Sequence, residues 1–255
     1  MKRLLIYTFL FTVLIACKKT IDVDLKNAPP KIVIEAVVTN STSAEVTLSK
    51  SVPFSQSNSF PKVSGAVVSI TDNGVNYELI ETKPGIYRNS LLIGIPEHTY
   101  HLSVKVEGKE YTATSTMPLQ VNFDSLQMEK IFWGNESIWV VKPQYTDPAG
   151  FGNSYMFIET INGKQFPDFW VWDDNIVNNS VSTIPLIQSD STIKTGDSVE
   201  VEMRCIDKNT FRYFTALQGS QQNATTPANP ENKITGGALG YFSAHTTQRK
   251  NVKVQ

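Results

Sequence analysis

The sequence predicts an all-β protein in which a β-sandwich is followed by a second β-rich domain, either a barrel or a sandwich, with one short helix. Apolar and polar residues alternate with period two through much of the chain, which is typical of strands buried on one face. Turn residues recur at short intervals, as in Asp72-Asn73-Gly74, which supplies the positive φ that a tight hairpin needs. Short strands separated by frequent turns are typical of sandwiches and barrels.

The strands expected in residues 31–118 form a complete sandwich. Residues 31–38 are rich in β-branched side chains, which predicts a well-buried strand. Residues 99–106 alternate cleanly and place Tyr100, Leu102 and Val104 on one face. Because Met117-Pro118 follows the last expected hairpin and proline breaks a strand, we predict the domain boundary near residue 118. The other strands are expected at 45–50, 63–71, 75–80, 86–88 and 110–116.

Residues 119–255 form the second predicted domain, whose strands are longer and more aromatic. A helix is expected at 209–217, since Phe211, Phe214 and Leu217 recur along one helical face, and Asp207 or Asn209 suits its start. The polar loop after it, 221–240, has strong turn residues that indicate a defined shape. The strands of this domain are expected at 122–131, 137–145, 155–162, 169–172, 181–187 and 198–206.

The N-terminus has the three parts of a secretory signal, so residues 1–16 are expected to be removed. Two basic residues precede an apolar stretch over 4–14, which is too short to span about 30 Å of hydrocarbon as a helix. The stretch ends in Leu14-Ile15-Ala16-Cys17, which resembles the lipobox of bacterial lipoprotein precursors. That resemblance implies acyl chains such as palmitate on Cys17, with residues 17–30 as a polar tether.

The predicted lipid on Cys17 anchors the chain to a membrane without a spanning helix. Each buried CH₂ group contributes about 0.8 kcal/mol, and a single acyl chain holds a protein only marginally. The two or three chains of a bacterial lipoprotein exceed that threshold. The expected partner of Cys17 is therefore the membrane itself.

Composition and motifs argue against several classes of function. A net charge of −1 offers no basic field for nucleic acid. The chain contains no Gly-x-Ser-x-Gly, phosphate-loop or dinucleotide motif. After lipidation Cys205 is the one remaining cysteine, and it alternates with Val201 and Met203, so we interpret it as a core residue. We therefore expect no catalytic residues, no metal and no cofactor, and we predict that the protein is not an enzyme.

Polar groups that suggest chemistry also have simpler explanations. His98 and His101 are three residues apart and lie on opposite faces of a strand, which disfavours a zinc pair. Glu200 and Glu202 are interpreted as like charges on a solvent face rather than paired catalytic carboxylates. The acidic run 173–175 lacks the spacing of a cation-binding loop and is interpreted as a solvated turn.

Five aromatic residues are the predicted binding residues. In the run 166–173, Trp170 and Trp172 share one strand face and Phe169 lies on the other. One face is core, and the other is either an open apolar stripe or buried as well. Tyr241-Phe242 ends the second expected contact segment, 221–242, whose glycines favour packing back onto the β-structure. His245 follows and is expected to be exposed near the terminus.

Several separated motifs occur together in the chain. They are the lipobox, 32–38, 63–72, 85–87, 99–102, Tyr111 with Met117-Pro118, and 229–242, in which 232–242 is the most specific in its spacing. Together they resemble the Bacteroidota outer-membrane lipoproteins grouped as domain-of-unknown-function family 4249, over nearly the whole mature chain. The stretch 65–104 is also similar to prealbumin-like sandwiches, which implies a prealbumin- or immunoglobulin-like fold for residues 31–118.

The family resemblance implies an outer-membrane address, on the periplasmic or cell-surface face, and association with TonB-dependent transporters. It implies no catalytic residue. The main hypothesis is therefore an outer-membrane-anchored lipoprotein with a non-catalytic accessory or ligand-capture role beside such a transporter. The alternatives are a structural or adhesive surface protein and a glycan or peptide hydrolase whose carboxylates converge in a cleft.

Overall fold

The computed structural model describes residues 29–53, 59–176, 178–189, 193–221 and 230–255. The predicted signal peptide, Cys17 and most of the tether lie outside the described residues, as does part of the loop 221–240. The described chain is mostly β-structure with one α-helix, which confirms the all-β prediction. Within these residues the strands form two sheets, neither of which closes into a barrel.

The N-terminal sandwich consists of seven strands, β1 to β7, that enclose one apolar core. One layer contains β1, β2 and β5, and the other contains β3, β6 and β7. Between them β4 pairs with both β3 and β5, so the two layers are one continuous, folded sheet. The strands are β1 (Ile32–Thr39), β2 (Ala44–Lys50), β3 (Val67–Asp72), β4 (Val75–Lys83), β5 (Ile86–Asn89), β6 (Thr99–Val106) and β7 (Lys109–Thr116).

The C-terminal part packs two layers around a second core. β12, β9 and β8 form a three-stranded sheet, and β11, β10, β13 and β14 form the layer opposite it. Cys205 lies in this core with Val201 and Met203, as predicted. The strand expected at 181–187 is reduced to two residues. The elements are β8 (Phe123–Trp133), β9 (Glu136–Thr146), β10 (Ser154–Ile161), β11 (Lys164–Asp173), β12 (Val181–Ser182), β13 (Ser198–Cys205) and β14 (Leu239–Lys253).

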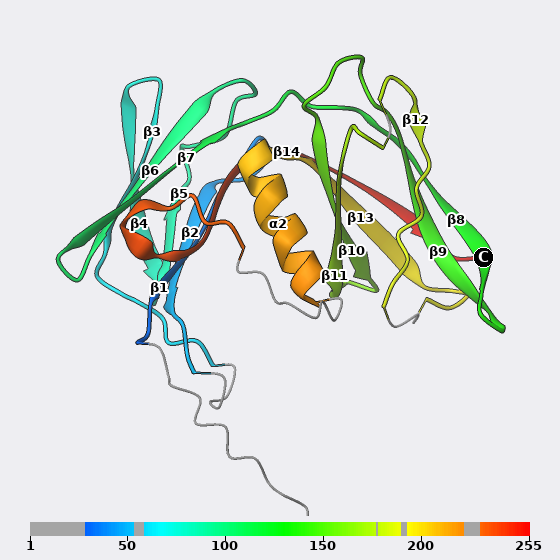
Figure 1. Cartoon of the computed structure of the whole chain (residues 1–255), viewed down its shortest axis with the longest axis horizontal. Coiled ribbons are helices and arrows are strands. Elements are labelled where there is room, and N and C mark those ends of the chain that lie inside the picture. Colours follow the sequence, from blue (N-terminus) through cyan, green and yellow to red (C-terminus); the bar gives the residue numbers. More distant parts are fainter. Residues whose placement is uncertain (1–28, 54–58, 177, 190–192, 222–229) are drawn as a thin grey trace, which may run out of the picture.

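The last strand, β14, joins the two parts into a sheet of eleven strands (Figure 1). Its first half pairs in parallel with β1, from Val33–Leu239 to Thr39–His245, and its second half pairs antiparallel with β13. The sequence does not predict this strand, because its second half is mainly polar. β14 contributes side chains to both cores, and the boundary near residue 118 stays a prediction.

The helix α2 (Lys208–Gln221) lies in front of the sheet between the two β parts (Figure 1). It begins as predicted with Asp207 as its cap, because the Thr210 N–H donates to Asp207 Oδ1 at 2.7 Å. Its apolar face covers the outer side of β10, where Phe214 packs with Met156 and Ile158. In the part of the chain that the structure describes, no helix is long and apolar enough to cross a membrane.

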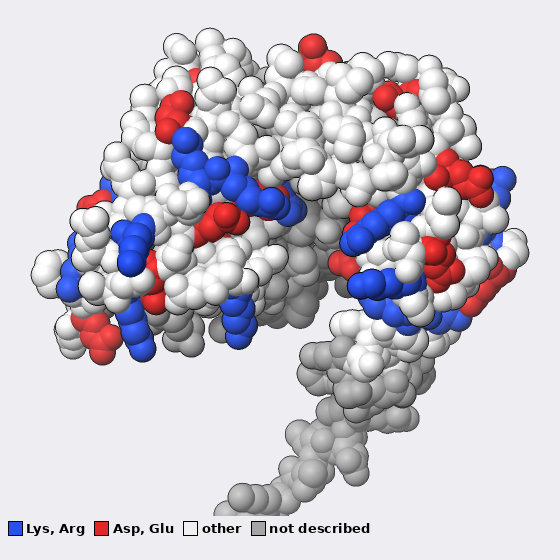
Figure 2. All heavy atoms as spheres, turned by 180° about the vertical axis from the view of Figure 1, so that it is seen from behind, with Lys and Arg blue, Asp and Glu red and all other residues white. Residues whose placement is uncertain are grey.

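Charged side chains of both signs lie interspersed on the face seen from behind (Figure 2). Several form surface ion pairs, among them Lys142 with Glu129 and Lys50 with Glu107, each at 2.6 Å. Such partly exposed pairs contribute little to stability individually. They position side chains without building a core.

Candidate functional site

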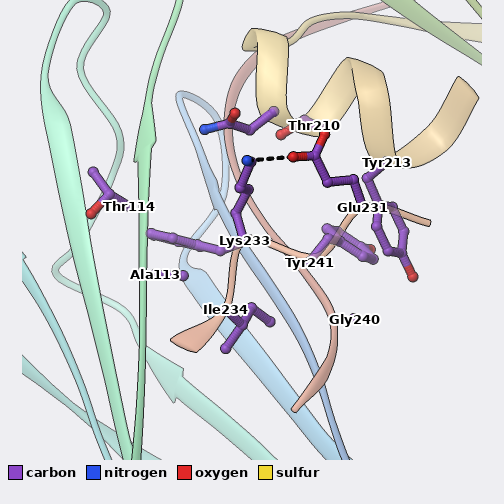
Figure 3. A pocket seen from close by; sticks show the side chains of 11 residues that line it. Ala113, Thr114, Thr210, Tyr213, Glu231, Lys233, Ile234, Gly240 and Tyr241 are labelled. Atoms are coloured by element: carbon purple, nitrogen blue, oxygen red, sulfur yellow. Dashed lines mark hydrogen bonds and ion pairs between the residues drawn. The ribbon is translucent and has the colours of Figure 1, made fainter. Parts of the chain in front are cut away.

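A crevice lies where the N-terminal sandwich, α2 and the segment 231–242 meet (Figure 3). β7 lines one side with Thr114, and the first turns of α2 line another with Thr210 and Tyr213. The segment that leads into β14 completes the wall and includes two predicted binding residues, Tyr241 and Phe242. Elements far apart in the sequence therefore build one site.

The segment takes its shape from the Asn232 side chain. Its Oδ1 accepts the Ile234 N–H at 2.7 Å, and its Nδ2 donates to the carbonyl oxygen of Ala238. These two bonds enclose the short 3₁₀ turn η1 (Thr235–Gly237). Asparagine suits this position because one side chain both donates and accepts.

The same turn is held against β7. Thr235 Oγ1 accepts the Thr112 N–H at 3.0 Å, and the two threonine hydroxyls lie 2.7 Å apart. Gly236 has φ +81°, and a Cβ there would stand 2.8 Å from the Glu110 carbonyl oxygen. A side chain at Gly236 would therefore force the turn away from β7, so the glycine allows this segment to pack onto the β-structure.

The crevice has a charged rim and a small interior. Lys233 Nζ lies 2.5 Å from Glu231 Oε1 at the mouth, and this hydrogen bond lowers the pKa of Glu231. Inside, Thr210 is 2% exposed, and its buried hydroxyl has no hydrogen-bond partner among the described residues. The interior volume is about 20 Å³, which is room for about one water molecule. Contact at the rim is therefore better supported than binding of a substrate inside.

The predicted aromatic stripe is not open to solvent. Trp172 is buried, stacks on Phe157 with ring centroids 4.5 Å apart, and donates its indole N–H to the Tyr145 hydroxyl at 2.6 Å. Trp170 is half-buried against the same core, and its indole N–H donates to the Ile187 carbonyl at 3.2 Å. The face that carries both tryptophans therefore belongs to the core of the C-terminal part.

The other predicted binding residues are also packed. Phe169, on the opposite face of β11, meets Phe214 of α2 edge-on at 5.3 Å. Tyr241 meets the same ring at 4.9 Å, whereas Phe242 lies buried in the core of the N-terminal sandwich. Both faces of the aromatic run are covered, so the structure has the buried arrangement rather than the open stripe. Of the five residues, Tyr241 and Phe242 line the crevice.

Two groups expected at the surface are buried, and both expectations are wrong. Burial raises the pKa of Glu202, but the guanidinium groups of Arg204 at 2.5 Å and Arg249 at 2.6 Å outweigh it and hold the pKa at about 2. Burial also lowers the pKa of His245 to about 3, and its Nδ1 lies 3.0 Å from Ser243 Oγ. Both residues lie on interior strands of the eleven-stranded sheet, Glu202 on β13 and His245 on β14.

A wider cleft of about 220 Å³ lies where the loop after β9 meets the end of β11 and the start of α2. Phe151 is 80% exposed at its edge, and Asp173 and Arg212 line it. Beneath it Asp174 is buried and accepts the backbone N–H of Asn153 at 2.9 Å. Asp174 thus fixes the loop, and the interpretation of the acidic run as a wholly solvated turn is wrong for this residue.

Two fully buried carboxylates are not singled out by the sequence analysis. Burial raises the pKa of Glu159 to about 7, and its Oε2 accepts a hydrogen bond from Gln188 at 2.5 Å. Asp147 accepts the hydroxyl proton of Tyr155. For Glu159 a signal exists, since it is a single acid within the apolar strand β10. Among the described residues, no three His, Cys, Asp or Glu side chains form a group that suits a metal ion.

Comparison with known proteins identifies a family. A family model described as a domain of unknown function, DUF4249, matches residues 18–251. No curated protein matches the chain. The matched range includes both β parts, α2 and all residues of the crevice.

Proposed function

The chain belongs to the DUF4249 family, and from this premise we propose that it is a lipid-anchored outer-membrane protein with a non-catalytic accessory role beside a TonB-dependent transporter. The lipobox-like sequence ending in Cys17 and the polar residues after it support the anchor. The family description names no activity. The outer-membrane location and the transporter partner are proposed from the family resemblance.

The crevice is the observation that carries the accessory role. Its rim presents a half-exposed ion pair, Lys233 with Glu231, beside the Thr114 hydroxyl of β7. Its interior holds little more than a water molecule. A polar rim around a small, partly apolar centre suits contact with another protein better than turnover of a substrate.

Crosslinking in intact cells tests the partner. A photoreactive amino acid replaces Lys233 in one strain and Lys164, an exposed residue of the β10–β11 hairpin, in a control strain. We expect a TonB-dependent transporter to crosslink at position 233 and not at 164. Crosslinks to no membrane protein, or equal crosslinks at both positions, would contradict the accessory role.

The anchor is tested separately. A Cys17→Ser chain should leave membranes that are washed at high salt, whereas the wild-type chain should stay. Mass spectrometry of the wild-type protein should find acyl chains on Cys17 and no residues before it. A mature protein with an unmodified cysteine would exclude the anchor.

Ligand capture is the second candidate, favoured by the cleft at Phe151. An exposed ring beside Asp173 and Arg212 combines stacking with groups of both charges, which suits a small polar ligand. Native mass spectrometry should find a small molecule bound to the wild-type protein and absent from Phe151→Ala. The structural or adhesive alternative predicts unchanged nutrient uptake on deletion but altered adhesion, and the hydrolase alternative predicts release of glycan or peptide products that deletion abolishes.

A further inference from the structure

One end of the N-terminal sandwich, the end at which β1 begins, carries a cluster of lysines that we call the basic end. Lysine side chains lie there on the surface seen from behind, with acidic side chains among them (Figure 2). Two of them pair with neighbouring glutamates, Lys50 with Glu107 at 2.6 Å and Lys105 with Glu110 at 3.7 Å. The other four are exposed and form no ion pair within the described residues: Lys31, Lys62, Lys83 and Lys109.

Backbone pairing brings these lysines together from separate parts of the chain. The Lys31 carbonyl accepts the Ser51 N–H at 2.9 Å, and the Lys50 N–H donates to the Pro61 carbonyl at 2.9 Å. The segments before β1, after β2 and before Val63 are thereby fixed side by side. Lys62 forms a bridge with Ser49 in the same place.

Two hairpins complete the basic end. The Leu48 N–H donates to the Gly85 carbonyl at 2.8 Å, which places the turn after Lys83 beside the end of β2. The β6–β7 turn reaches the same end, because Val106 pairs with Lys109 and Glu107 meets Lys50. The lysines thus belong to rigid strand ends rather than to one mobile loop.

The opposite end of the sandwich has a different charge pattern. Its connecting segments, 39–45, 72–75, 89–99 and 116–122, contain no lysine or arginine. They carry Glu45, Asp72 and Glu97 instead. The two ends of the sandwich therefore differ in charge, and the positive end is the one at which the described chain begins.

The basic end also exposes apolar side chains. Phe60 is 50% exposed two residues before Lys62, and Val67, at the start of β3, is 58% exposed. Exposed apolar side chains among basic residues are typical of surfaces that insert shallowly into a bilayer interface. The opposite end also exposes apolar side chains, with Leu91 at 82% and Leu119 at 62%, so the lysines rather than the apolar residues distinguish the two ends.

We propose that the basic end docks on the anionic headgroups of the bilayer that holds the lipid anchor. This inference rests on the proposed acylation of Cys17. A polar tether alone limits distance but not orientation, since each extended residue spans up to about 3.5 Å. Electrostatic attraction, about five-fold in partition for each lysine near an anionic surface, adds orientation. The end with Asp72 and Glu97 then faces away from the membrane.

Vesicle binding of the unanchored chain tests the proposal. The mature chain with Cys17→Ser is sedimented with vesicles of phosphatidylcholine, with or without phosphatidylglycerol. We expect binding only when phosphatidylglycerol is present, and a loss of binding at high salt. Binding to neither vesicle, or equal binding to both, overturns the proposal.

A matched pair of variants locates the contact. One carries Lys31→Gln, Lys62→Gln, Lys83→Gln and Lys109→Gln. The control replaces four exposed lysines of the C-terminal part and has the same net charge. At about five-fold per lysine, the first should lose more than about a hundred-fold in partition, and the control should stay within a few-fold of wild type. Equal losses would assign the effect to net charge and overturn the proposal. The control positions are Lys130, Lys164, Lys194 and Lys253.

Two further outcomes separate the possible failures. Inorganic phosphate at constant ionic strength should not compete with the vesicles, and competition would indicate a discrete phosphate site and overturn membrane docking. An unacylated Cys17 in cells would defeat the proposed function while vesicle binding of the Cys17→Ser chain stands. If Cys17 is acylated but the two four-lysine variants bind vesicles equally well, the lipid anchor stands and the proposed docking of the basic end is overturned.

Discussion

Gly240 of β14 lies directly against the backbone of Ile34 in β1. A Cβ on Gly240 would stand 2.0 Å from the Ile34 carbonyl oxygen, and the glycine has φ +105°. The two residues are register partners in the parallel ladder that joins the N-terminal sandwich to the C-terminal part. The junction therefore depends on a position that tolerates no side chain.

We expect Gly240→Ala to lower the free energy of unfolding by about 3 kcal/mol, since it combines a disfavoured φ with a backbone clash. Urea denaturation measures the change. Gly219→Ala is the control, because Gly219 lies in α2, has no positive φ, and would have open space around an added Cβ. It should leave stability unchanged or raise it by less than about 1 kcal/mol. Equal losses in the two variants would contradict the proposed close approach.

The local part of the fold is predictable from the sequence, whereas the junction is not. Tyr100, Leu102 and Val104 alternate with polar residues, and such strands show their period and their buried face directly. β14 begins with apolar residues and continues through Thr246, Thr247 and Gln248, so it lacks a continuous pattern. Its parallel pairing with β1 is also a contact between opposite ends of the chain, which no local pattern reports.

The candidate site is harder to predict for the same reason. The sequence points to Tyr241 and Phe242, and both line the crevice. It does not point to Thr210 or Thr114, because their positions depend on how α2 and β7 meet. The expectation that His245 is exposed fails because closeness to the end of the chain does not show whether a residue lies on an interior strand of a sheet.

Glu202 should stabilise the fold above its ordinary pKa. Its folded pKa of about 2 lies below the ordinary 4.5 because of Arg204 and Arg249. The stabilisation is fully present above pH 4.5 and is lost as pH falls from there toward 2. We expect Glu202→Gln to cost about 1–3 kcal/mol at pH 7, a range reduced because Arg249 is half-exposed, and little at pH 2.

Denaturation of both proteins across this pH range measures the difference. Glu200→Gln is the control, since Glu200 approaches Arg249 only to 3.9 Å, and it should change stability by less than about 0.5 kcal/mol. If the difference in the free energy of unfolding between wild type and Glu202→Gln stays constant from pH 7 to 2, Glu202 does not stabilise the fold through its charge.

Asp207 links α2 to β7, and Asp207→Ala should destabilise the protein by about 1–2 kcal/mol. One carboxylate oxygen caps the helix through the Thr210 N–H, and the other accepts the Ser115 hydroxyl proton at 2.6 Å. Asp207→Asn keeps an oxygen that caps the helix but has one acceptor oxygen fewer. Its loss of stability should therefore be smaller than that of Asp207→Ala. Thermal denaturation measures both variants, and equal losses would place the effect outside the helix cap.

Glu159 should destabilise the fold as pH rises, the reverse of Glu202. Burial raises its folded pKa to about 7 from the ordinary 4.5, with Asp168 nearby adding to the rise and the hydrogen bond from Gln188 opposing it. Between these values the folded state holds a proton that the unfolded state has released, so stability falls from pH 4.5 to 7 and stays lower above. The fall should be about 3 kcal/mol.

Replacing Glu159 with glutamine removes the proton exchange while keeping an oxygen that accepts from Gln188. The pH-dependent fall between 4.5 and 7 should therefore shrink in Glu159→Gln, although the buried amide group adds a constant cost of about 1–3 kcal/mol. Urea denaturation at several pH values separates the two effects, because only the slope of the free energy of unfolding against pH reports the titration. Unchanged slopes would mean that Glu159 releases its proton at its ordinary pKa, and that water reaches this carboxylate in the core of the C-terminal part.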